Sequence, residues 1–125
     1  MKTYRILCVD DEPMMRDVAA LSLRRDPAFE VRTCSSGPEA LASLDSWWPD
    51  LVVLDVVMPV MDGPEVLARL RERAPERPVP VVFVTARAQH EETERLKALG
   101  AAGVVAKPFN PATLAAVLRA FLPVS

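Results

Sequence analysis

The chain has 125 residues, of which half are hydrophobic and about a quarter are charged, and its formal net charge is −2. This length and balance are typical of one globular domain with a full hydrophobic core. The small net charge offers no basic field for nucleic acid or an anionic membrane surface. No apolar run approaches the roughly 18 residues of a membrane-spanning helix, and no secretory signal core precedes Asp10. We therefore expect one domain over residues 1–125 in the cytoplasm, with residues 122–125 as the start of a linker if the chain continues.

Short apolar runs alternate with amphipathic stretches along the chain. The apolar runs predict strands at residues 5–9, 29–34, 51–55, 79–85 and 103–106, because runs of this length between turn signals favour strands over helices. The stretches after them predict helices that begin near residues 11, 36, 62, 89 and 110. Strict alternation implies right-handed crossovers and a parallel sheet with helices on both faces, a doubly wound α/β fold.

Helix ends and inner faces are also marked in the sequence. Ser36 and Glu39 have the spacing of a capping box, and Asp62 is a second expected N-cap. Gly100 is expected to end the fourth helix. Apolar residues at helical spacing are expected to face the core: Met14, Met15, Val18 and Leu21 in the first helix, Leu41, Leu44 and Trp48 in the second, and Leu114, Val117, Leu118 and Phe121 in the fifth.

Polar residues follow four of the predicted strands, directly at their carboxyl ends. Asp10 and Asp11 follow the first strand and Asp55 ends the third. Thr85 ends the fourth strand, and Lys107 follows the fifth. In a parallel sheet these ends share one edge, where such folds bind their ligands. Carboxylates gathered there repel one another unless a proton or a cation intervenes, and oxygen ligands without thiol or imidazole indicate Mg²⁺ or Mn²⁺.

A cation held by carboxylates beside a lysine and a hydroxyl suits phosphoryl transfer, which depends mainly on positioning and charge neutralisation. Asp55 ends a strand that reads as buried on both faces, so it lies at the rim of the sheet and can act as a nucleophile. Lys107 and the Thr85 hydroxyl can each bind a phosphoryl oxygen. The sequence therefore predicts an aspartyl phosphate at Asp55, assisted by Thr85 and Lys107.

These motifs resemble, over essentially the full length of the chain, the receiver domain of two-component response regulators. The resemblance rests on segments that occur in order: Val9-Asp10-Asp11, Leu54-Asp55 with Met58-Pro59 and Met61-Asp62-Gly63, Val84-Thr85-Ala86, and Lys107-Pro108-Phe109. It implies a flavodoxin-like sheet of five parallel strands in the order 2-1-3-4-5, with five helices. It also implies that Asp55 takes its phosphoryl group from the phosphohistidine of a histidine kinase or a histidine phosphotransfer protein. Such a protein is a switch that carries out its own phosphorylation and dephosphorylation, and it is not a metabolic enzyme.

The resemblance further implies roles for single residues and surfaces. Asp11 and Asp55 match direct Mg²⁺ ligands, Asp10 acts largely through water, and the backbone carbonyl of Val57 completes the metal site. The peptide bond before Pro108 is expected to be cis. Downstream signalling is expected by protein contact or phosphorelay, through the surface of the fourth helix, fifth strand and fifth helix, with no direct contact to nucleic acid or membrane.

One position departs from the family pattern. The family usually has Tyr or Phe three residues before the matching lysine, and this chain has Val104, which is too short to swing between buried and exposed positions. This departure leaves open a pseudo-receiver, an interaction module that is never phosphorylated. A phosphatase of the haloacid-dehalogenase type is the other alternative, but it requires a second aspartate where this chain has Val57.

Overall fold

Strands and helices alternate throughout residues 2–122, the part of the chain that the computed structural model describes. All strands pair in parallel, in the order β2-β1-β3-β4-β5. The predicted fold class and strand order are therefore confirmed, whereas residues 123–125 of the predicted linker lie outside the described residues. The elements are β1 (Tyr4–Val9), α1 (Pro13–Leu23), β2 (Phe29–Cys34), α2 (Gly37–Ser43), β3 (Leu51–Asp55), α3 (Gly63–Arg73), β4 (Val81–Thr85), α4 (His90–Ala98), β5 (Gly103–Ala106) and α5 (Leu114–Arg119).

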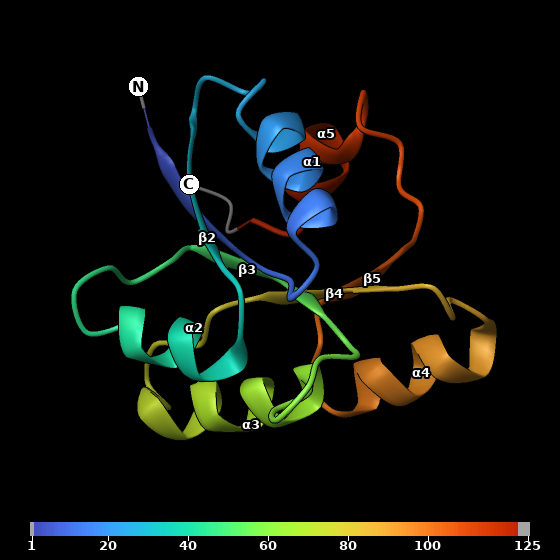
Figure 1. The fold of residues 1–125 in the computed structure, drawn as a ribbon. Helices are drawn as coiled ribbons and strands as arrows, with labels where there is room; N and C mark the ends of the chain where they lie inside the picture. The colour runs from blue at the N-terminus through green and yellow to red at the C-terminus, as the bar shows by residue number, and fades with distance from the viewer. Residues whose placement is uncertain (1, 123–125) are drawn as a thin grey trace.

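Two layers of helices enclose the sheet, with α1 and α5 on one face and α2, α3 and α4 on the other (Figure 1). Every residue of β3 is buried, because this central strand is covered on both faces. Leu51 and Val53 pack with the core under α1 and α5, while Val52 and Leu54 pack with the core under the other three helices. Alternate side chains of one apolar run thus serve two separate cores. No helix in residues 2–122 has the length and apolar character needed to cross a membrane.

The inner face of α1 differs from the prediction. This helix buries Ala19, Ala20 and Leu23 instead, and Met14 and Leu21 are 74% and 67% exposed. The helix carries two apolar stripes, and the one with two alanines can approach the sheet more closely than a stripe of long side chains. The other two residues predicted to face inward are only partly buried: Met15 and Val18.

The fifth helix begins later than predicted. Residues 111–113 form a turn, in which the Asn110 side chain accepts a hydrogen bond from the Ala112 N–H at 2.9 Å. This hydrogen bond has the pattern of an N-cap, but Thr113 has a φ of −118° and a ψ of −6°, away from regular α-helical geometry, and α5 starts at Leu114. On α5, Leu114 and Leu118 are buried as predicted, but Val117 is 43% exposed.

Two further boundaries differ from the prediction. The Ser43 hydroxyl donates to the carbonyl of Ala40 at 2.7 Å, and α2 ends at Ser43, so Trp48 lies beyond this helix. Strand β4 begins at Val81 because the preceding Pro80 has no N–H to give to a sheet.

The predicted caps and the cis peptide bond are confirmed. Glu39 N–H donates to the Ser36 hydroxyl at 3.2 Å, and Glu65 N–H donates to the Asp62 carboxylate at 2.9 Å. The peptide bond before Pro108 is cis. These caps fix where α2 and α3 begin, and the α3 cap ends the loop that follows Asp55.

Candidate functional site

The sheet brings the predicted polar residues to one edge. Strands β1 and β3 are neighbours, so Asp10, one residue beyond β1, lies beside Asp55 at the end of β3. Strands β4 and β5 are also neighbours, and the Lys107 N–H donates to the Thr85 carbonyl at 2.8 Å. The chain leaves β1 towards β2 and returns to β3, so strand order reverses between β1 and β3, the point where open α/β sheets bind ligands.

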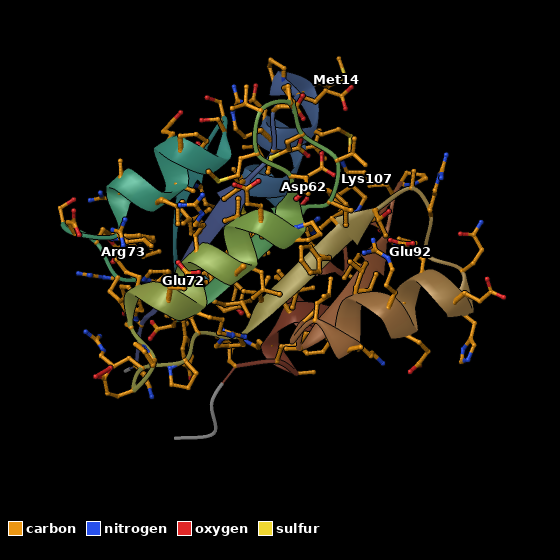
Figure 2. All side chains as sticks on the ribbon, turned by 90° about the horizontal axis from the view of Figure 1, so that it is seen from below. Met14, Asp62, Glu72, Arg73, Glu92 and Lys107 are labelled. Atoms are coloured by element: carbon orange, nitrogen blue, oxygen red, sulfur yellow. The ribbon has the colours of Figure 1, made fainter. Side chains whose placement is uncertain are left out.

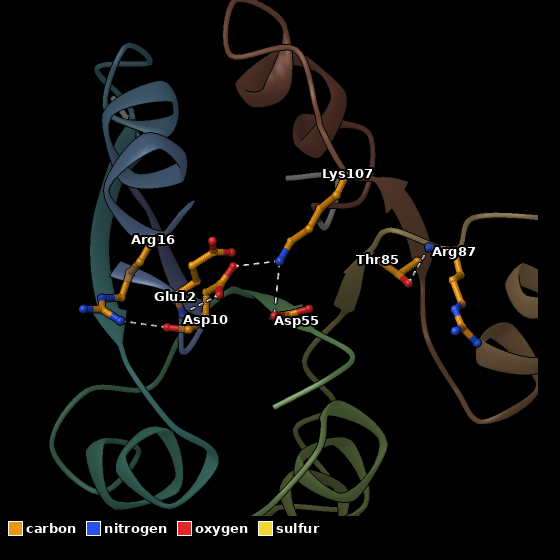
Figure 3. A network of polar contacts seen from close by, with 7 residues as sticks. All are labelled: Asp10, Glu12, Arg16, Asp55, Thr85, Arg87 and Lys107. Carbon is orange, nitrogen blue, oxygen red and sulfur yellow. Dashed lines mark hydrogen bonds and ion pairs between the residues drawn. The ribbon is translucent and has the colours of Figure 1, made fainter. Parts of the chain in front are cut away.

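The Lys107 ammonium lies between two carboxylates (Figure 3). Its Nζ is 3.1 Å from Asp10 Oδ2 and 3.2 Å from Asp55 Oδ2. Burial by itself lowers the pKa of Lys107, but the hydrogen bonds and charges of both carboxylates outweigh burial and raise this pKa above its usual value. Lys107 is therefore a charged group that neutralises part of the acidic cluster.

Asp55 is only 8% exposed. Burial raises the pKa of its carboxyl, Lys107 lowers it and Asp10 raises it, and the net result is a pKa above the usual value for aspartate. The Val57 backbone also lowers this pKa. A buried carboxylate with a raised pKa and a lysine partner, at the edge of a cavity, is the kind of group found at functional sites.

Asp10 is oriented by the backbone around it. Its carboxylate accepts a hydrogen bond from the Glu12 N–H at 2.9 Å, and its carbonyl accepts one from Arg16 Nη1 at 2.9 Å (Figure 3). Sequence reasoning did not anticipate Arg16, because a carbonyl partner leaves no signal in the sequence.

The three predicted acidic ligands fit a hard divalent cation. Asp10, Asp11 and Asp55 each offer a carboxylate oxygen, and these oxygens lie within 4.8 Å of one another. One cation of the size of Mg²⁺ or Mn²⁺ can contact such a group through direct and water-mediated ligands, and the all-oxygen donor set suits a hard ion. The structure places Val57 at the lining of the same cavity, but its predicted carbonyl ligand stays a prediction.

Thr85 is buried at the end of β4, and its hydroxyl accepts a hydrogen bond from the Arg87 N–H at 3.0 Å. It lines a cavity of about 840 Å³ together with Asp55 and Lys107. The cavity thus joins the acceptor, hydroxyl and lysine that the sequence predicts.

The cavity also extends to charged residues beyond those that the sequence predicted for the site. Asp62 and Glu92 line it, and both lie at the same end of the molecule as Lys107 (Figure 2). Arg95 lines it as well. Glu92 and Arg95 belong to α4, and their place at this cavity depends on the course of the β4–α4 loop, which no local pattern predicts.

Comparisons with known proteins agree with this arrangement. A family model described as the response regulator receiver domain matches residues 6–119. The chain is 40% identical over 117 residues to a protein-glutamate methylesterase/protein-glutamine glutaminase of Geobacillus kaustophilus, in a match that covers 91% of this chain and 33% of that protein. It is 38% identical over 117 residues to the sensory transduction protein RegX3 of Mycobacterium tuberculosis, with 94% and 50% covered. The chain therefore spans a third to a half of the length of these curated relatives.

A solved structure has the same fold over nearly the whole chain. The chemotaxis response regulator CheY4 of Vibrio cholerae is 35% identical, with a TM-score of 0.87, and the match covers 97% of this chain and 100% of that one. The parallel sheet and the helices that connect its strands are thus shared with a response regulator over 97% of this chain.

Proposed function

The chain belongs to the receiver-domain family of two-component response regulators, and from this membership we propose that Asp55 is its phosphoacceptor. The phosphoryl donor is the phosphohistidine of a histidine kinase or of a histidine phosphotransfer protein. One observation carries the assignment: the Lys107 ammonium lies 3.2 Å from Asp55 and 3.1 Å from Asp10, at a cavity that can admit a phosphoryl group.

The transfer requires one bond to form and one to break. A carboxylate oxygen of Asp55 donates an electron pair to phosphorus, and the N–P bond of the donor breaks. Its electrons return to the donor imidazole, which takes up a proton. Lys107 binds a phosphoryl oxygen, and the Thr85 hydroxyl at the neighbouring strand end donates to another. These residues supply the positioning and charge that phosphoryl transfer needs from a protein.

Three acids, Asp10, Asp11 and Asp55, would hold the divalent cation, with the Val57 carbonyl as a further ligand. We propose Mg²⁺ for this site, with Mn²⁺ as the alternative, because the donors are all oxygen. The bound cation would supply positive charge to the phosphoryl oxygens. The chain's own contribution is to keep the acids together, with Lys107 as the resident counter-charge.

We propose that the protein is a signalling switch, which carries out its own phosphorylation and dephosphorylation, and not a metabolic enzyme. Its output is protein contact or onward phosphotransfer through the surface of α4, β5 and α5, without direct contact to nucleic acid or membrane. We place it in the cytoplasm as one domain over residues 1–125. The small net charge supports this view, because it offers no basic field for nucleic acid or lipid.

Intact-mass spectrometry after incubation with acetyl phosphate and Mg²⁺ tests the proposal. We expect a gain of one phosphoryl group in the wild type and in Asp62→Asn, a control aspartate at the same cavity. We expect no gain in Asp55→Asn. Phosphorylation of Asp55→Asn at full yield would refute the assignment, and no gain with any donor, including cognate kinases, would identify a pseudo-receiver.

A further inference from the structure

Arg87 lies between the phosphorylation site and the start of α4. It lines the same cavity as Asp55, and with Glu92 it also lines a second cavity of about 390 Å³. Its N–H is bound to the Thr85 hydroxyl at 3.0 Å, so its backbone is tied to the end of β4. Its side chain points away from Asp55 and Lys107 (Figure 3). Within residues 2–122 its guanidinium makes no hydrogen bond or ion pair.

Glu92, in the first turn of α4, lies between two arginines, Arg87 and Arg95. Its carboxylate accepts hydrogen bonds from Nε and Nη2 of Arg95. The pKa of Glu92 is lowered, chiefly by the hydrogen bond from Arg95 and also by the charge of Arg87. The Arg95 guanidinium is therefore hydrogen-bonded to Glu92, whereas Arg87 is attracted to the same carboxylate by its charge and makes no direct bond to it.

Helix α4 is weakly anchored compared with its neighbour. It buries one side chain, Leu96, whereas α3 buries Val66, Leu67 and Leu70. Its N-cap, Gln89, makes no capping hydrogen bond through its side chain. Segments with little buried surface and exposed ends open at low free energy, so the first turn of α4 can respond to a small change in charge.

A phosphoryl group changes the charge balance of the cavity. Asp55 lies in an acidic cluster with Asp10 and Asp11, and Lys107 pairs with Asp10 and Asp55. An aspartyl phosphate carries about −1.5 to −2 charges where the aspartate carried one. A bound divalent cation offsets only part of this charge. Among the arginines at the cavity, Arg87 can turn towards the phosphoryl oxygens without breaking an ion pair, and guanidinium groups bind such oxygens through two parallel hydrogen bonds.

We propose that phosphorylation of Asp55 draws the Arg87 guanidinium away from Glu92 and onto the phosphoryl group, and that this exchange releases the first turn of α4. The inference rests on the proposed phosphorylation of Asp55. It gives this chain an electrostatic link to the α4 surface, in place of the aromatic side chain that Val104 does not supply. Val104 itself is half-buried and packs against the core under α2, α3 and α4.

Hydrogen–deuterium exchange of residues 90–98, with and without beryllofluoride and Mg²⁺, tests this link. Beryllofluoride stands in for the phosphoryl group, and its bound fraction is measured by fluorine NMR. In the wild type, we expect exchange in the first turn of α4 to become about two- to fivefold faster, the range set by exposed ion pairs. In Arg87→Gln, we expect no such increase in exchange when the same fraction of the protein has beryllofluoride bound. Reaching that bound fraction is expected to require more fluoride than in the wild type.

Two further variants test whether faster exchange in α4 comes from the exchange of Arg87 between Glu92 and the phosphoryl group, or from a general loosening of the surface. Glu92→Gln is expected to exchange fast at α4 even without beryllofluoride, because the carboxylate that binds Arg95 and attracts Arg87 is removed. Arg69→Gln removes an exposed i,i+4 ion pair on α3 and is the matched control, with the wild-type response expected.

The outcomes distinguish this inference from the proposed function. If beryllofluoride binds the wild type and α4 exchange does not change, the link is refuted and the phosphoacceptor assignment stands. A full increase in Arg87→Gln at equal occupancy also refutes the link. If beryllofluoride does not bind the wild type at all, the phosphoacceptor assignment fails and the link fails with it.

Discussion

Val60, in the loop between β3 and α3, has a left-handed backbone with a φ of 70°. This conformation costs a residue with a Cβ about 1–2 kcal/mol, and a β-branched residue is among the least suited to it. Its side chain is 95% exposed, so removing it sacrifices almost no packing. Glycine relieves the strain but gives back about 0.5–1 kcal/mol through the greater entropy of the unfolded chain. We expect Val60→Gly to raise the free energy of unfolding by about 0.5–1 kcal/mol.

Urea unfolding and thermal melting measure this gain, and the melting temperature is expected to rise by roughly 2–5 °C for a domain of this size. Val57→Gly is the matched control, because Val57 lies in the same loop, is 77% exposed and does not have a positive φ. It should lose about 0.5–1 kcal/mol, since glycine adds flexibility and relieves nothing. The strain argument fails if Val60→Gly is no more stable than the wild type, or if both variants gain equally.

Three other changes probe the site and its scaffold. Lys107→Met removes the cation that lies 3.1 and 3.2 Å from two carboxylates. We expect a lower melting temperature than in the wild type without Mg²⁺, and a larger rise in melting temperature when Mg²⁺ is added. An equal rise in the two proteins would contradict this. Gly63→Ala would place a Cβ 2.5 Å from the Asp55 carbonyl, so acetyl phosphate labelling and the unfolding free energy should both fall, the latter by about 1–3 kcal/mol. Arg119 lowers the pKa of Asp26, so the stability from this pair is present above about pH 4 and is lost as the pH falls through the lowered pKa. The difference in urea midpoint between the wild type and Asp26→Asn should therefore shrink from pH 6 to about pH 3, and a constant difference would refute the assignment.

The parts of the fold that could be predicted from the sequence are those where burial in the folded protein requires a recognisable local pattern of apolar residues. Strand β3 is covered on both faces, and a strand in that position must be apolar at every residue, which is how Leu51 to Leu54 reads. The polar residues at the strand ends were predictable for a similar reason. Parallel strands place their carboxyl ends on one edge, so Asp55, Thr85 and Lys107 had to lie near one another once the alternation of elements was recognised.

The parts that could not be predicted are those where the sequence is compatible with more than one local arrangement and tertiary packing decides between them. Helix α1 carries two apolar stripes, and only its distance from the sheet decides that Ala19 and Ala20 face inward while Leu21 faces out. The late start of α5 coincides with the irregular backbone of Thr113, which no local pattern marks. The meeting of Arg87 and Glu92 at the cavity depends on the path of a loop, which has no periodicity to read.

The loop after Asp55 shows why a reactive carboxylate needs residues that have no chemistry of their own. The Gly63 N–H donates to the Val56 carbonyl at 2.8 Å, and its missing side chain leaves room for the carbonyl of Asp55 and the ring of Phe83. The loop must therefore return to within van der Waals contact of the strand it left. A loop closed so tightly at both ends can hold Val60 in an unfavourable conformation, because the hydrogen bonds and packing at its ends outweigh the strain at its tip. Asp55 is held in place by this closed loop as well as by Lys107, which makes position, more than acidity, the property that the surrounding sequence specifies.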